Sequence, residues 1–466
     1  MLFTSTEFVT LFLPGVLAVY YLLPRGWRNV RNLFLLAVSL FFYACGESRH
    51  LLLLLLSICA NYLLGAWMMR VRDRTPARRL VTAVTAGFNL SVLFVFKYLT
   101  FTLSTLRGFL GADFRVPQIA LPIGISFFTF QAMSYVLDIA RRRADAQKNP
   151  LWVGLYISFF PQLIAGPIVK YETVAREITA RRESWKDFSA GLCRFAVGFT
   201  KKILLANTLA IVADDAFGAP VLSVGLAWLG SLAYTFQIFF DFSAYSDMAI
   251  GLGRMFGFHF LENFNYPYVS QSITEFWRRW HISLSTWFRD YVYFPLGGSR
   301  VPRGKQYRNL FVVWLLTGIW HGANWTFIAW GLYYFVLLAV EKSLGWDKHT
   351  PARWRALPTF LLVNFGWVLF RADSMSAAVR FIAAMFGAAD GGLWSAAATA
   401  ALRDYKVFFA LAVLFSAPVA GWLSRRRFTK TVPAALLYIA GLLVVVVIAF
   451  TYLAKGAYNP FIYFNF

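Results

Sequence analysis

Charged residues are scarce in this chain. Only 14% of its 466 residues are Asp, Glu, Lys or Arg, and 59% are hydrophobic, whereas soluble globular proteins carry about 25% charged residues. The composition therefore excludes a soluble protein. Apolar runs that approach the roughly 20 residues needed to cross a bilayer occur at residues 8–23, 32–45, 51–69, 80–106, 408–423 and 432–453. We expect an all-α polytopic membrane protein with about eleven spanning or re-entrant segments.

Cysteines and the common catalytic signatures are also rare or missing. The three cysteines, Cys45, Cys59 and Cys193, are scattered and form no CxxC spacing, so we expect neither a disulfide framework nor a metal site. The sequence has no usable GxxxxGKS/T, GxGxxG, HExxH or GxSxG element. That absence disfavours nucleotide hydrolysis, dinucleotide binding, zinc proteolysis and serine hydrolysis, and we expect no bound cofactor.

Acidic residues number only 22 against 45 Lys and Arg, which gives a net charge of +23. Such a charge can indicate nucleic-acid binding, but the basic residues lie in short loops between apolar runs, for example at residues 70–79 and 141–148. The intervening loops near Glu47, Asp113 and Asp214 are poorer in Lys and Arg. This alternation is the positive-inside pattern. It predicts cytoplasmic basic loops against anionic lipid headgroups, an N-terminus outside, and no nucleic-acid partner.

The apolar segments change in character along the chain. We expect one membrane domain over residues 1–466, with peripheral helices at 1–110, a catalytic core at 120–345 and C-terminal helices at 355–466. The core segments contain Pro, Gly and polar groups, which are tolerated at membrane depth where the backbone lines a cavity or is covered by other helices. Because basic loops flank residues 150–169 on both sides, we expect this segment to enter the membrane as a broken helix and return.

Histidine is rare, with five in the chain, and His281 lies among aromatic residues. Over residues 274–293 apolar side chains recur at helical spacing, and polar ones, including Arg278 and Arg279, lie on the other face. The pattern predicts one amphipathic helix on or in the cytoplasmic face. We expect His281 in the buried stripe of that helix.

His321 lies within an apolar segment, residues 310–340, that is too long for one simple helix. Interruptions are predicted at residues 317–318 and at Gly322, and Asn324 at i+3 would share a helical face with His321. An imidazole at membrane depth is expensive and indicates a functional site. Because burial disfavours the imidazolium, a neutral imidazole can take the proton of a hydroxyl that attacks an acyl group. A neighbouring amide would stabilise the oxyanion.

Alternative roles of these polar residues stay open at this point. Each histidine also fits a core residue bonded to a backbone carbonyl. Asp241 and Asp247 lie in an apolar run, where they would orient a histidine, pair with Arg278 or Arg279, or form the proton path of a transporter. The two arginines suit the phosphates of an anionic donor such as coenzyme A or the membrane surface.

Five stretches resemble the membrane-bound O-acyltransferase family, and in particular its bacterial polysaccharide branch, of which the alginate O-acetylases are typical. They are residues 121–128 (LPIGISFF), 163–167 (LIAGP), 241–253 (DFSAYSDMAIGLG), 271–287 (QSITEFWRRWHISLSTW) and 320–325 (WHGANW). The resemblance covers most of the chain to about residue 346, and the C-terminal helices match only in character. Ala244 stands where relatives often carry Gly, a difference of one methyl group.

The resemblance implies transfer of an acyl group from a cytoplasmic donor to an acceptor across the membrane. His321 matches the family's catalytic histidine and His281 its second active-site histidine, both at a narrow passage through a ring of helices. Acetyl-CoA or another acetyl donor is the implied substrate.

The same resemblance implies a setting in the cell. It predicts a bacterial inner membrane location with a periplasmic N-terminus, and as partners a periplasmic acetyltransferase and the polysaccharide export machinery. Alginate, cellulose, another exopolysaccharide and peptidoglycan remain open as acceptor polymers. The rivals from other classes are a proton-coupled transporter and a scaffold for polymer export.

Overall fold

Helices make up all the regular secondary structure that the computed structural model describes. The described residues are 2–111, 113–164, 166–346, 352–419, 422, 431–456, 458–460 and 462, and they contain no strand. Among them, the helical stretches long and apolar enough to cross a membrane are Arg28–Val71, Thr75–Leu110, Trp185–Phe217, Trp325–Leu344 and Val432–Ala454. The all-α polytopic fold class is confirmed.

The chain forms two compact units, which are described separately. Unit 1 comprises Met1–Phe195 and Ser246–Leu261, and unit 2 comprises Ala196–Tyr245 and Glu262–Phe466. Helices α10 (Trp185–Thr200) and α12 (Val224–Met255) contribute residues to both units. The grouping into peripheral, core and C-terminal segments stays a prediction.

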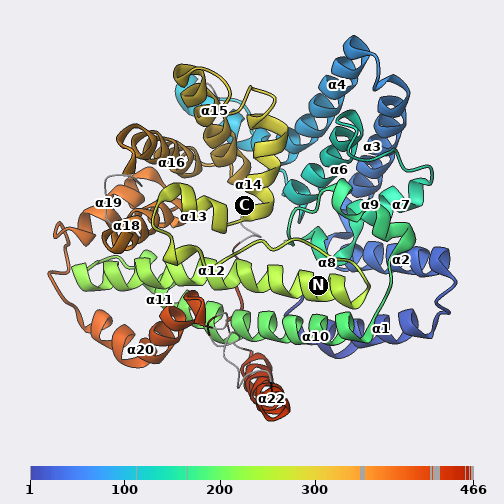
Figure 1. Ribbon diagram of the computed structural model, residues 1–466. Coiled ribbons are helices and arrows are strands. Elements are labelled where there is room, and N and C mark those ends of the chain that lie inside the picture. Colours follow the sequence, from blue (N-terminus) through green and yellow to red (C-terminus); the bar gives the residue numbers. More distant parts are fainter. Residues whose placement is uncertain are drawn as a thin grey trace. The chain divides into compact units, whose positions relative to one another are not determined.

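Unit 1 carries the first apolar runs, and each of them forms a helix as predicted. Its helices are η1 (Phe8–Phe12), α1 (Leu13–Leu22), α2 (Arg28–Glu47), η2 (Ser48–His50), α3 (Leu51–Val71), α4 (Thr75–Leu93), η3 (Phe94–Tyr98), α5 (Leu99–Leu110), α6 (Ile125–Ala140), α7 (Pro150–Ser158), α8 (Phe160–Leu163) and α9 (Tyr171–Ala180). Helix α6 packs against α3 and α4, and α7 packs against α2 and α3 (Figure 1).

The helix break predicted within residues 150–169 is confirmed, whereas entry of this segment into the membrane and its return stay a prediction. Asn149 caps the start of α7 by accepting a hydrogen bond from the Leu151 N–H at 3.0 Å. The helix ends at Ser158, because Phe159 adopts φ −55° and ψ 114°, and α8 follows with only four residues. Neither piece has the length that crosses a bilayer.

Unit 2 contains the segments with the two aromatic-flanked histidines. Its helices are η4 (Lys201–Ala206), α11 (Asn207–Phe217), η5 (Pro267–Val269), α13 (Ile273–Arg279), α14 (Ile282–Phe288), η6 (Arg289–Tyr293), α15 (Arg303–His321), α16 (Trp325–Leu344), α18 (Ala352–Arg371), α19 (Met375–Met385), α20 (Ala396–Ser416) and α22 (Val432–Ala454). Helix α16 packs against α15, α18 and α13, and their buried aromatic side chains form one apolar cluster.

Two glycines allow α15 and α16 to approach closely. A Cβ atom on Gly331 of α16 would lie 2.5 Å from the Trp314 carbonyl oxygen and 3.1 Å from the Gly318 Cα of α15. Small residues at such a crossing let two backbones come into contact. This contact fixes the position of α15 along α16, and therefore the position of the end of α15 relative to α16.

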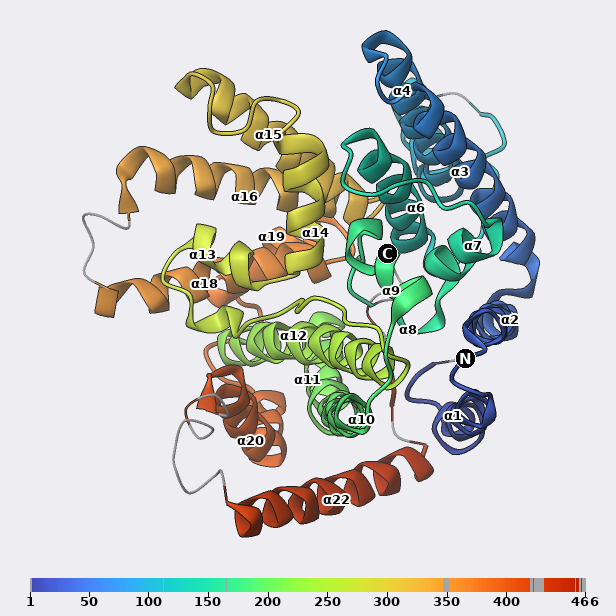
Figure 2. The same ribbon diagram turned by 45° about the vertical axis from the view of Figure 1, so that its right-hand side comes forward.

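The single amphipathic helix predicted for residues 274–293 is wrong. The segment forms α13, α14 and the π-helical η6, and the chain turns sharply between α13 and α14 (Figures 1 and 2). The turn lies at Trp280 and His281, where the ψ of Trp280 is 131° and the φ of His281 is +44°. His281 is therefore at a break between helices and not within a continuous helical stripe.

The interruption predicted near His321 is half right. Helix α15 runs without a break through Thr317 and Gly318 and ends at His321. The chain is extended at Gly322, and α16 begins at Trp325. Gly322 therefore marks the real break, whereas residues 317–318 do not.

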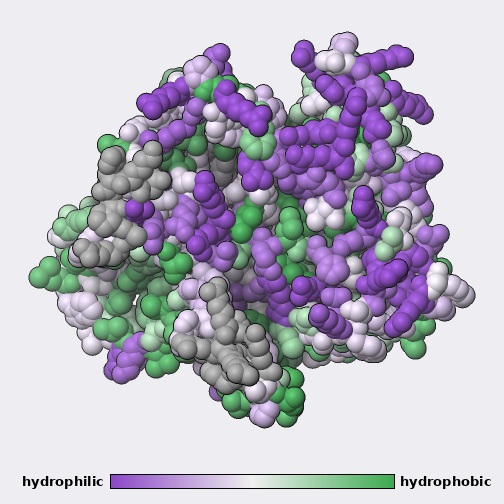
Figure 3. All heavy atoms as spheres, in the orientation of Figure 1, coloured by the Kyte–Doolittle hydropathy of each residue, from purple (hydrophilic) through white to green (hydrophobic). Residues whose placement is uncertain are grey.

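The surface of each unit reflects a membrane protein. Helix α22 in unit 2 exposes a nearly continuous apolar surface, including Leu437, Leu443 and Val447, each at least 60% exposed. In unit 1, hydrophilic side chains gather over the ends of α3, α4 and α9 on the face shown in Figure 3. Exposed apolar helices suit contact with lipid tails, and polar ends suit the bilayer surface.

Candidate active site

His281 occupies a strained turn that its neighbours hold in place. It is one of three non-glycine residues with positive φ among the described residues. The segment before α13 fixes the turn on both sides, because the Ile282 N–H donates to the Asn263 carbonyl and the Asn265 N–H donates to the Arg279 carbonyl, each at 2.9 Å. Strained backbone that its surroundings determine in this way is common at functional sites.

The hydrogen bonds around His281 define which ring nitrogen is basic. The Asn263 Oδ1 atom accepts from the Ser283 N–H at 3.1 Å and from the Ser283 hydroxyl at 2.9 Å, so this atom is an oxygen acceptor. His281 Nδ1 lies 3.2 Å from the same oxygen, and it must therefore be the protonated nitrogen of a neutral ring. Nε2 then carries the lone pair.

His281 is kept neutral. It is 1% exposed and lies in the turn between two short helices, and burial lowers the pKa of its imidazole to about 3. Its Nε2 atom makes no hydrogen bond within the part of the chain that the structure describes. At neutral pH this ring thus presents an uncharged acceptor nitrogen.

His321 is enclosed by aromatic rings from three helices. It is the last residue of α15 and is 4% exposed. Its ring centroid lies 4.9 Å from those of Trp320 and Trp330 and 5.1 Å from that of Phe370. An imidazole enclosed by aromatic side chains is shielded from water.

Trp320 connects the two histidines. Its ring centroid is 6.0 Å from that of His281 and 4.9 Å from that of His321. On its other side, His281 meets the Phe242 ring edge-on at 4.7 Å. The fold therefore brings the two histidines, 40 residues apart in sequence, into one aromatic cluster of unit 2.

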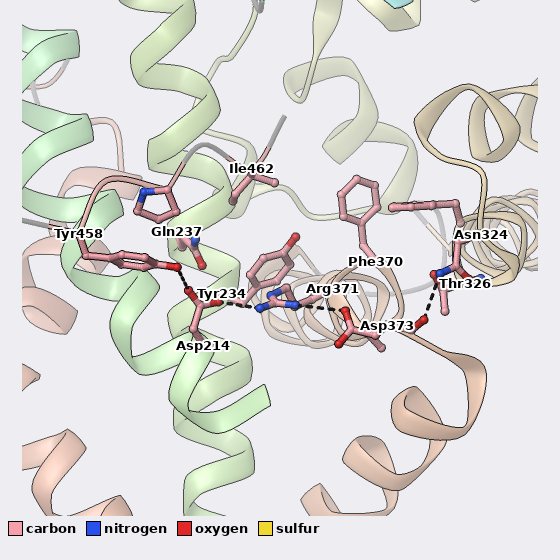
Figure 4. A pocket seen from close by; sticks show the side chains of 13 residues that line it. Asp214, Tyr234, Gln237, Asn324, Thr326, Phe370, Arg371, Asp373, Tyr458 and Ile462 are labelled. Carbon is pink, nitrogen blue, oxygen red and sulfur yellow. Dashed lines mark hydrogen bonds and ion pairs between the residues drawn. The ribbon is translucent and has the colours of Figure 1, made fainter. Parts of the chain in front are cut away.

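A cavity of about 280 Å³ lies beside this cluster in unit 2. Phe370 contacts the ring of His321 and also lines the cavity, together with Phe327 (Figure 4). Ligand pockets commonly measure about 300–1,000 Å³, so this space suits one small group. The remaining lining residues are Asp214, Tyr234, Gln237, Asn324, Thr326, Arg371, Ala372, Asp373, Tyr458, Pro460 and Ile462.

Charged and polar groups form a chain along the cavity (Figure 4). Asp214 accepts from Arg371 at 2.7 Å and from the Tyr458 hydroxyl at 2.8 Å. Arg371 also lies 3.8 Å from the carboxylate of Asp373. The cavity therefore has an apolar wall toward His321 and a hydrogen-bonding wall opposite.

Asn324 does not share a helical face with His321, because the two residues lie on either side of the break. Its side chain caps α16 by accepting from the Thr326 N–H at 3.1 Å, and it donates to the Asp373 carbonyl at 3.1 Å. Asn324 reaches the site as a lining residue of the cavity instead.

The predicted acids lie in two separate ion pairs. Asp241 pairs with Lys202 at 2.8 Å in unit 2, and Asp247 pairs with Arg194 at 2.9 Å in unit 1. These ion pairs differ from the pairing with Arg278 or Arg279 that was one of the alternatives left open by the sequence. A carboxamide, not a carboxylate, orients His281.

The two candidate donor-binding arginines differ in their contacts. Arg278 is exposed at the end of α13. Arg279 pairs with Glu275 at 2.8 Å and donates to the Asn265 carbonyl. Arg278 is therefore the more exposed of the two, and the Arg279 guanidinium is engaged by Glu275.

Sequence reasoning missed Asn263 and Lys202. Asn263 lies in a polar stretch with no distinguishing pattern, and its role follows from the tertiary fold. Lys202 carried a usable signal, because it is a charge within the apolar stretch Trp185–Phe217. Within the described residues no group of His, Cys, Asp and Glu is arranged to hold a metal ion.

Comparison with known proteins places these features in a family. Residues 125–376 match the description MBOAT, membrane-bound O-acyltransferase family. The probable alginate O-acetylase AlgI of Pseudomonas putida is 45% identical over 399 residues, covering 84% of this chain and 81% of that protein. The peptidoglycan O-acetyltransferase of Helicobacter pylori is 36% identical, covering 83% and 80%. The teichoic acid D-alanyltransferase of Bacillus subtilis is 31% identical, covering 53% and 68%.

Proposed function

The chain belongs to the membrane-bound O-acyltransferase family and is an O-acyltransferase, and from that premise we propose its acyl group, direction and acceptor. It transfers an acetyl group from a cytoplasmic donor, acetyl-CoA or another acetyl donor, across the bacterial inner membrane for O-acetylation of an exported polysaccharide. Similarity to alginate O-acetylases over most of both chains supports acetyl as the group and an alginate-like polymer as the acceptor.

The observation that carries this proposal is the cluster of His281, Trp320 and His321 beside the cavity. It combines neutral imidazole, exclusion of water and room for a small group. These are the requirements of acyl transfer to a hydroxyl without hydrolysis of the donor.

The charge pattern supports the proposed direction of transfer. Helix α15 begins at Arg303, beside basic residues expected on the cytoplasmic side. Its 19 residues rise about 28 Å, so His321 at the far end lies toward the periplasm. In the same topology α18 runs outward to Arg371, which lines the cavity. In this topology the cavity therefore faces the periplasm, from which the acceptor would enter.

In the proposed reaction, the acceptor hydroxyl oxygen attacks the acetyl carbonyl carbon as the bond to the donor breaks. The hydroxyl proton passes to His321, and from there to the leaving group, which is the coenzyme A thiolate when acetyl-CoA is the donor. His321 acts as general base, or as a relay if the acetyl group rests on its ring. The neutral His281 assists by accepting a hydrogen bond at Nε2.

Donor binding and partners complete the proposal. Arg278 is the better candidate for the donor phosphates, because Glu275 occupies Arg279. A periplasmic acetyltransferase partner passes the acetyl group to the polymer within the export machinery, and the N-terminus is periplasmic. Membrane lipids surround the exposed apolar helices.

Replacement of His321 tests the proposal. In cells that lack the native chain, His321→Ala should reduce the O-acetyl content of the exported polysaccharide to background, because the proposed reaction then loses the imidazole that takes the hydroxyl proton. His281→Ala should reduce it at least about tenfold. His50→Ala is the matched control, since His50 pairs with Glu47 in unit 1 at 2.6 Å and should change nothing.

Equal acetylation in the His321→Ala and His50→Ala cells, at equal membrane levels, would contradict the enzyme assignment. Chemical analysis of the acetylated polymer decides the acceptor. Acetyl groups on uronic acid residues support the alginate-like polymer, and acetyl groups on cellulose or muropeptides instead overturn that part of the proposal.

A further inference from the structure

Residues 458–460 and 462 are held in unit 2 by contacts with the side chains of Asp214, Asn207, Lys202 and Asp241. The Tyr458 hydroxyl donates to Asp214 at 2.8 Å, and the Asn207 amide donates to Asn459 Oδ1 at 3.1 Å. The other two contacts come from Lys202 and Asp241. Within this segment Ile462 is 7% exposed and belongs to the same apolar cluster as Trp330 and Phe370.

Lys202 and Asp241 form a deeply buried ion pair. Their side chains are 1% and 2% exposed, and Nζ lies 2.8 Å from Oδ1. Removing two charges from water costs several kcal/mol per ion, and a buried pair offsets this only when its remaining polar capacity is satisfied. Such a pair is weak evidence for stability, so its contacts indicate what else it does.

Both members of the pair bind the backbone of the segment. Lys202 Nζ donates to the Pro460 carbonyl oxygen, and Asp241 Oδ2 accepts from the Ile462 N–H at 3.0 Å. Lys202 also lies in the π-helical turn η4 (Lys201–Ala206), a distortion that is frequent at functional sites because it redirects side chains. The pair therefore works as a clamp on main-chain groups.

The clamped segment is a wall of the cavity beside His321. Tyr458, Pro460 and Ile462 line it together with Asn324 and Phe370 (Figure 4). Phe370 is in ring contact with His321. A change in the position of this segment thus alters the space next to the catalytic histidine.

We propose that Lys202 and Asp241 are positioning residues that hold residues 458–460 and 462 as the acceptor-side wall of the cavity, and so set the rate at which an acceptor hydroxyl reaches His321. This inference rests on the proposed function. A displacement of about 1 Å in a reacting geometry costs up to about a hundredfold in rate. Loss of the clamp lowers kcat more than it changes the KM for the donor, because the donor enters from the other side.

Two double variants separate positioning from stability. Lys202→Met with Asp241→Leu removes both charges together and leaves no charge unpaired. Lys202→Met with Asp241→Asn is nearly the same size but keeps a side-chain oxygen that accepts the Ile462 N–H. The two chains therefore differ mainly in the hydrogen bond to the segment.

The position of the segment is measured by thiol labelling. The three native cysteines are replaced by alanine, Ile462→Cys is introduced, and the detergent-solubilised full chain is reacted with a maleimide. The Leu-containing double variant should label about tenfold faster than the parent, since the opened segment exposes residue 462. The Asn-containing variant loses only the Lys202 contact to Pro460, so its labelling rate should lie between those of the Leu-containing variant and the parent. Their Tm values should agree within a few degrees.

Acetyl transfer in membrane vesicles gives the second readout, without the Ile462→Cys change. The Leu-containing variant should lose about tenfold or more in kcat with little change in donor KM, and the Asn-containing variant, which keeps only the contact to the Ile462 N–H, should recover part of that loss. Equal labelling rates in the two variants overturn the inference. So does an equal loss of kcat in both variants, since the pair would then act only through fold stability.

A variant pair within the segment keeps the test decisive if the buried double variants fail to fold. Ile462→Pro removes the N–H that Asp241 accepts, whereas Ile462→Ala removes a similar amount of side chain and keeps the N–H. The proline chain should be at least about fivefold slower than the alanine chain. Equal rates overturn the clamp. Failure of the wild-type chain to transfer acetyl would instead reject the proposed function, and the labelling comparison needs no transfer.

Discussion

At the scale of single residues, the site depends on which nitrogen of His281 is basic. Asn263 Oδ1 is fixed as an acceptor by Ser283, so it orients the imidazole with Nδ1 protonated and Nε2 available. The arrangement resembles the acceptor that fixes the tautomer of a catalytic histidine in other enzymes. Here the acceptor is neutral, so the buried ring gains no countercharge that would favour its protonation.

Substitution of Asn263 tests this role. Asn263→Leu removes the acceptor and should lower the acetyl transfer rate about ten- to a hundredfold, because Nδ1–H is no longer held. Asn263→Asp keeps an acceptor but adds a charge that raises the pKa of His281. Its activity should therefore fall as the pH decreases through that raised pKa, while the wild type stays active. Acetyl transfer rates of both variants and the wild type are measured from pH 5 to 8. Identical pH profiles for Asn263→Asp and the wild type would contradict the role of Asn263 as the acceptor that orients His281.

Burial of both histidines could be predicted from sequence, but their partners could not. His281 and His321 are conspicuous because a polar ring among aromatic residues is rare. Asn263 is 18 residues away from His281 in a stretch without helical period. Its role depends on a turn that only the tertiary fold creates. Asn324 lines the cavity, but the helical spacing that suggested its place beside His321 is removed by the break at Gly322.

At the scale of elements, the position of His321 depends on the crossing of α15 and α16. Gly318 and Gly331 bring the two backbones into contact, and the end of α15 then falls between Trp330 of α16 and Phe370 of α18. The enclosure of His321 is thus a consequence of helix packing. Any residue that separates these helices also displaces the histidine.

Gly331→Ala should destabilise the chain by about 1–3 kcal/mol, because its Cβ would lie 2.5 Å from the Trp314 carbonyl oxygen. The acetyl transfer rate should fall about tenfold through displacement of His321. Gly441→Ala in α22 is the matched control, since nothing lies within 4 Å of its Cβ position, and it should be neutral or slightly stabilising. Thermal unfolding and transfer assays compare the two, and equal effects would contradict the packing argument.

Sequence periodicity located the elements better than it located their ends. The apolar spacing over residues 274–293 continues in phase across Trp280 and His281, so it cannot reveal that the chain turns there. The turn is imposed by two backbone hydrogen bonds, from the Ile282 N–H to the Asn263 carbonyl and from the Asn265 N–H to the Arg279 carbonyl. In contrast, Gly322 between two long apolar runs was a sufficient local signal for the break after α15.

At the scale of the whole chain, composition and charge were enough to predict a polytopic helical membrane protein. They could not predict that residues 458–460 and 462 would return to line a cavity with residues more than 200 positions earlier. That contact joins an ion pair within an apolar stretch to main-chain groups, and no local pattern encodes it. The charges of Lys202 and Asp241 within apolar runs were its trace in the sequence.

In the proposed reaction, acetyl groups cross the membrane at His321. This passage can be measured in membrane vesicles whose cytoplasmic face points outward. They carry the wild-type chain, the periplasmic partner and the nascent polymer in the lumen, and receive radiolabelled acetyl-CoA outside. We expect acetyl label on the polymer inside wild-type vesicles and only background label with His321→Ala. Label that remains outside the lumen, or equal luminal label in the two preparations, would contradict the account.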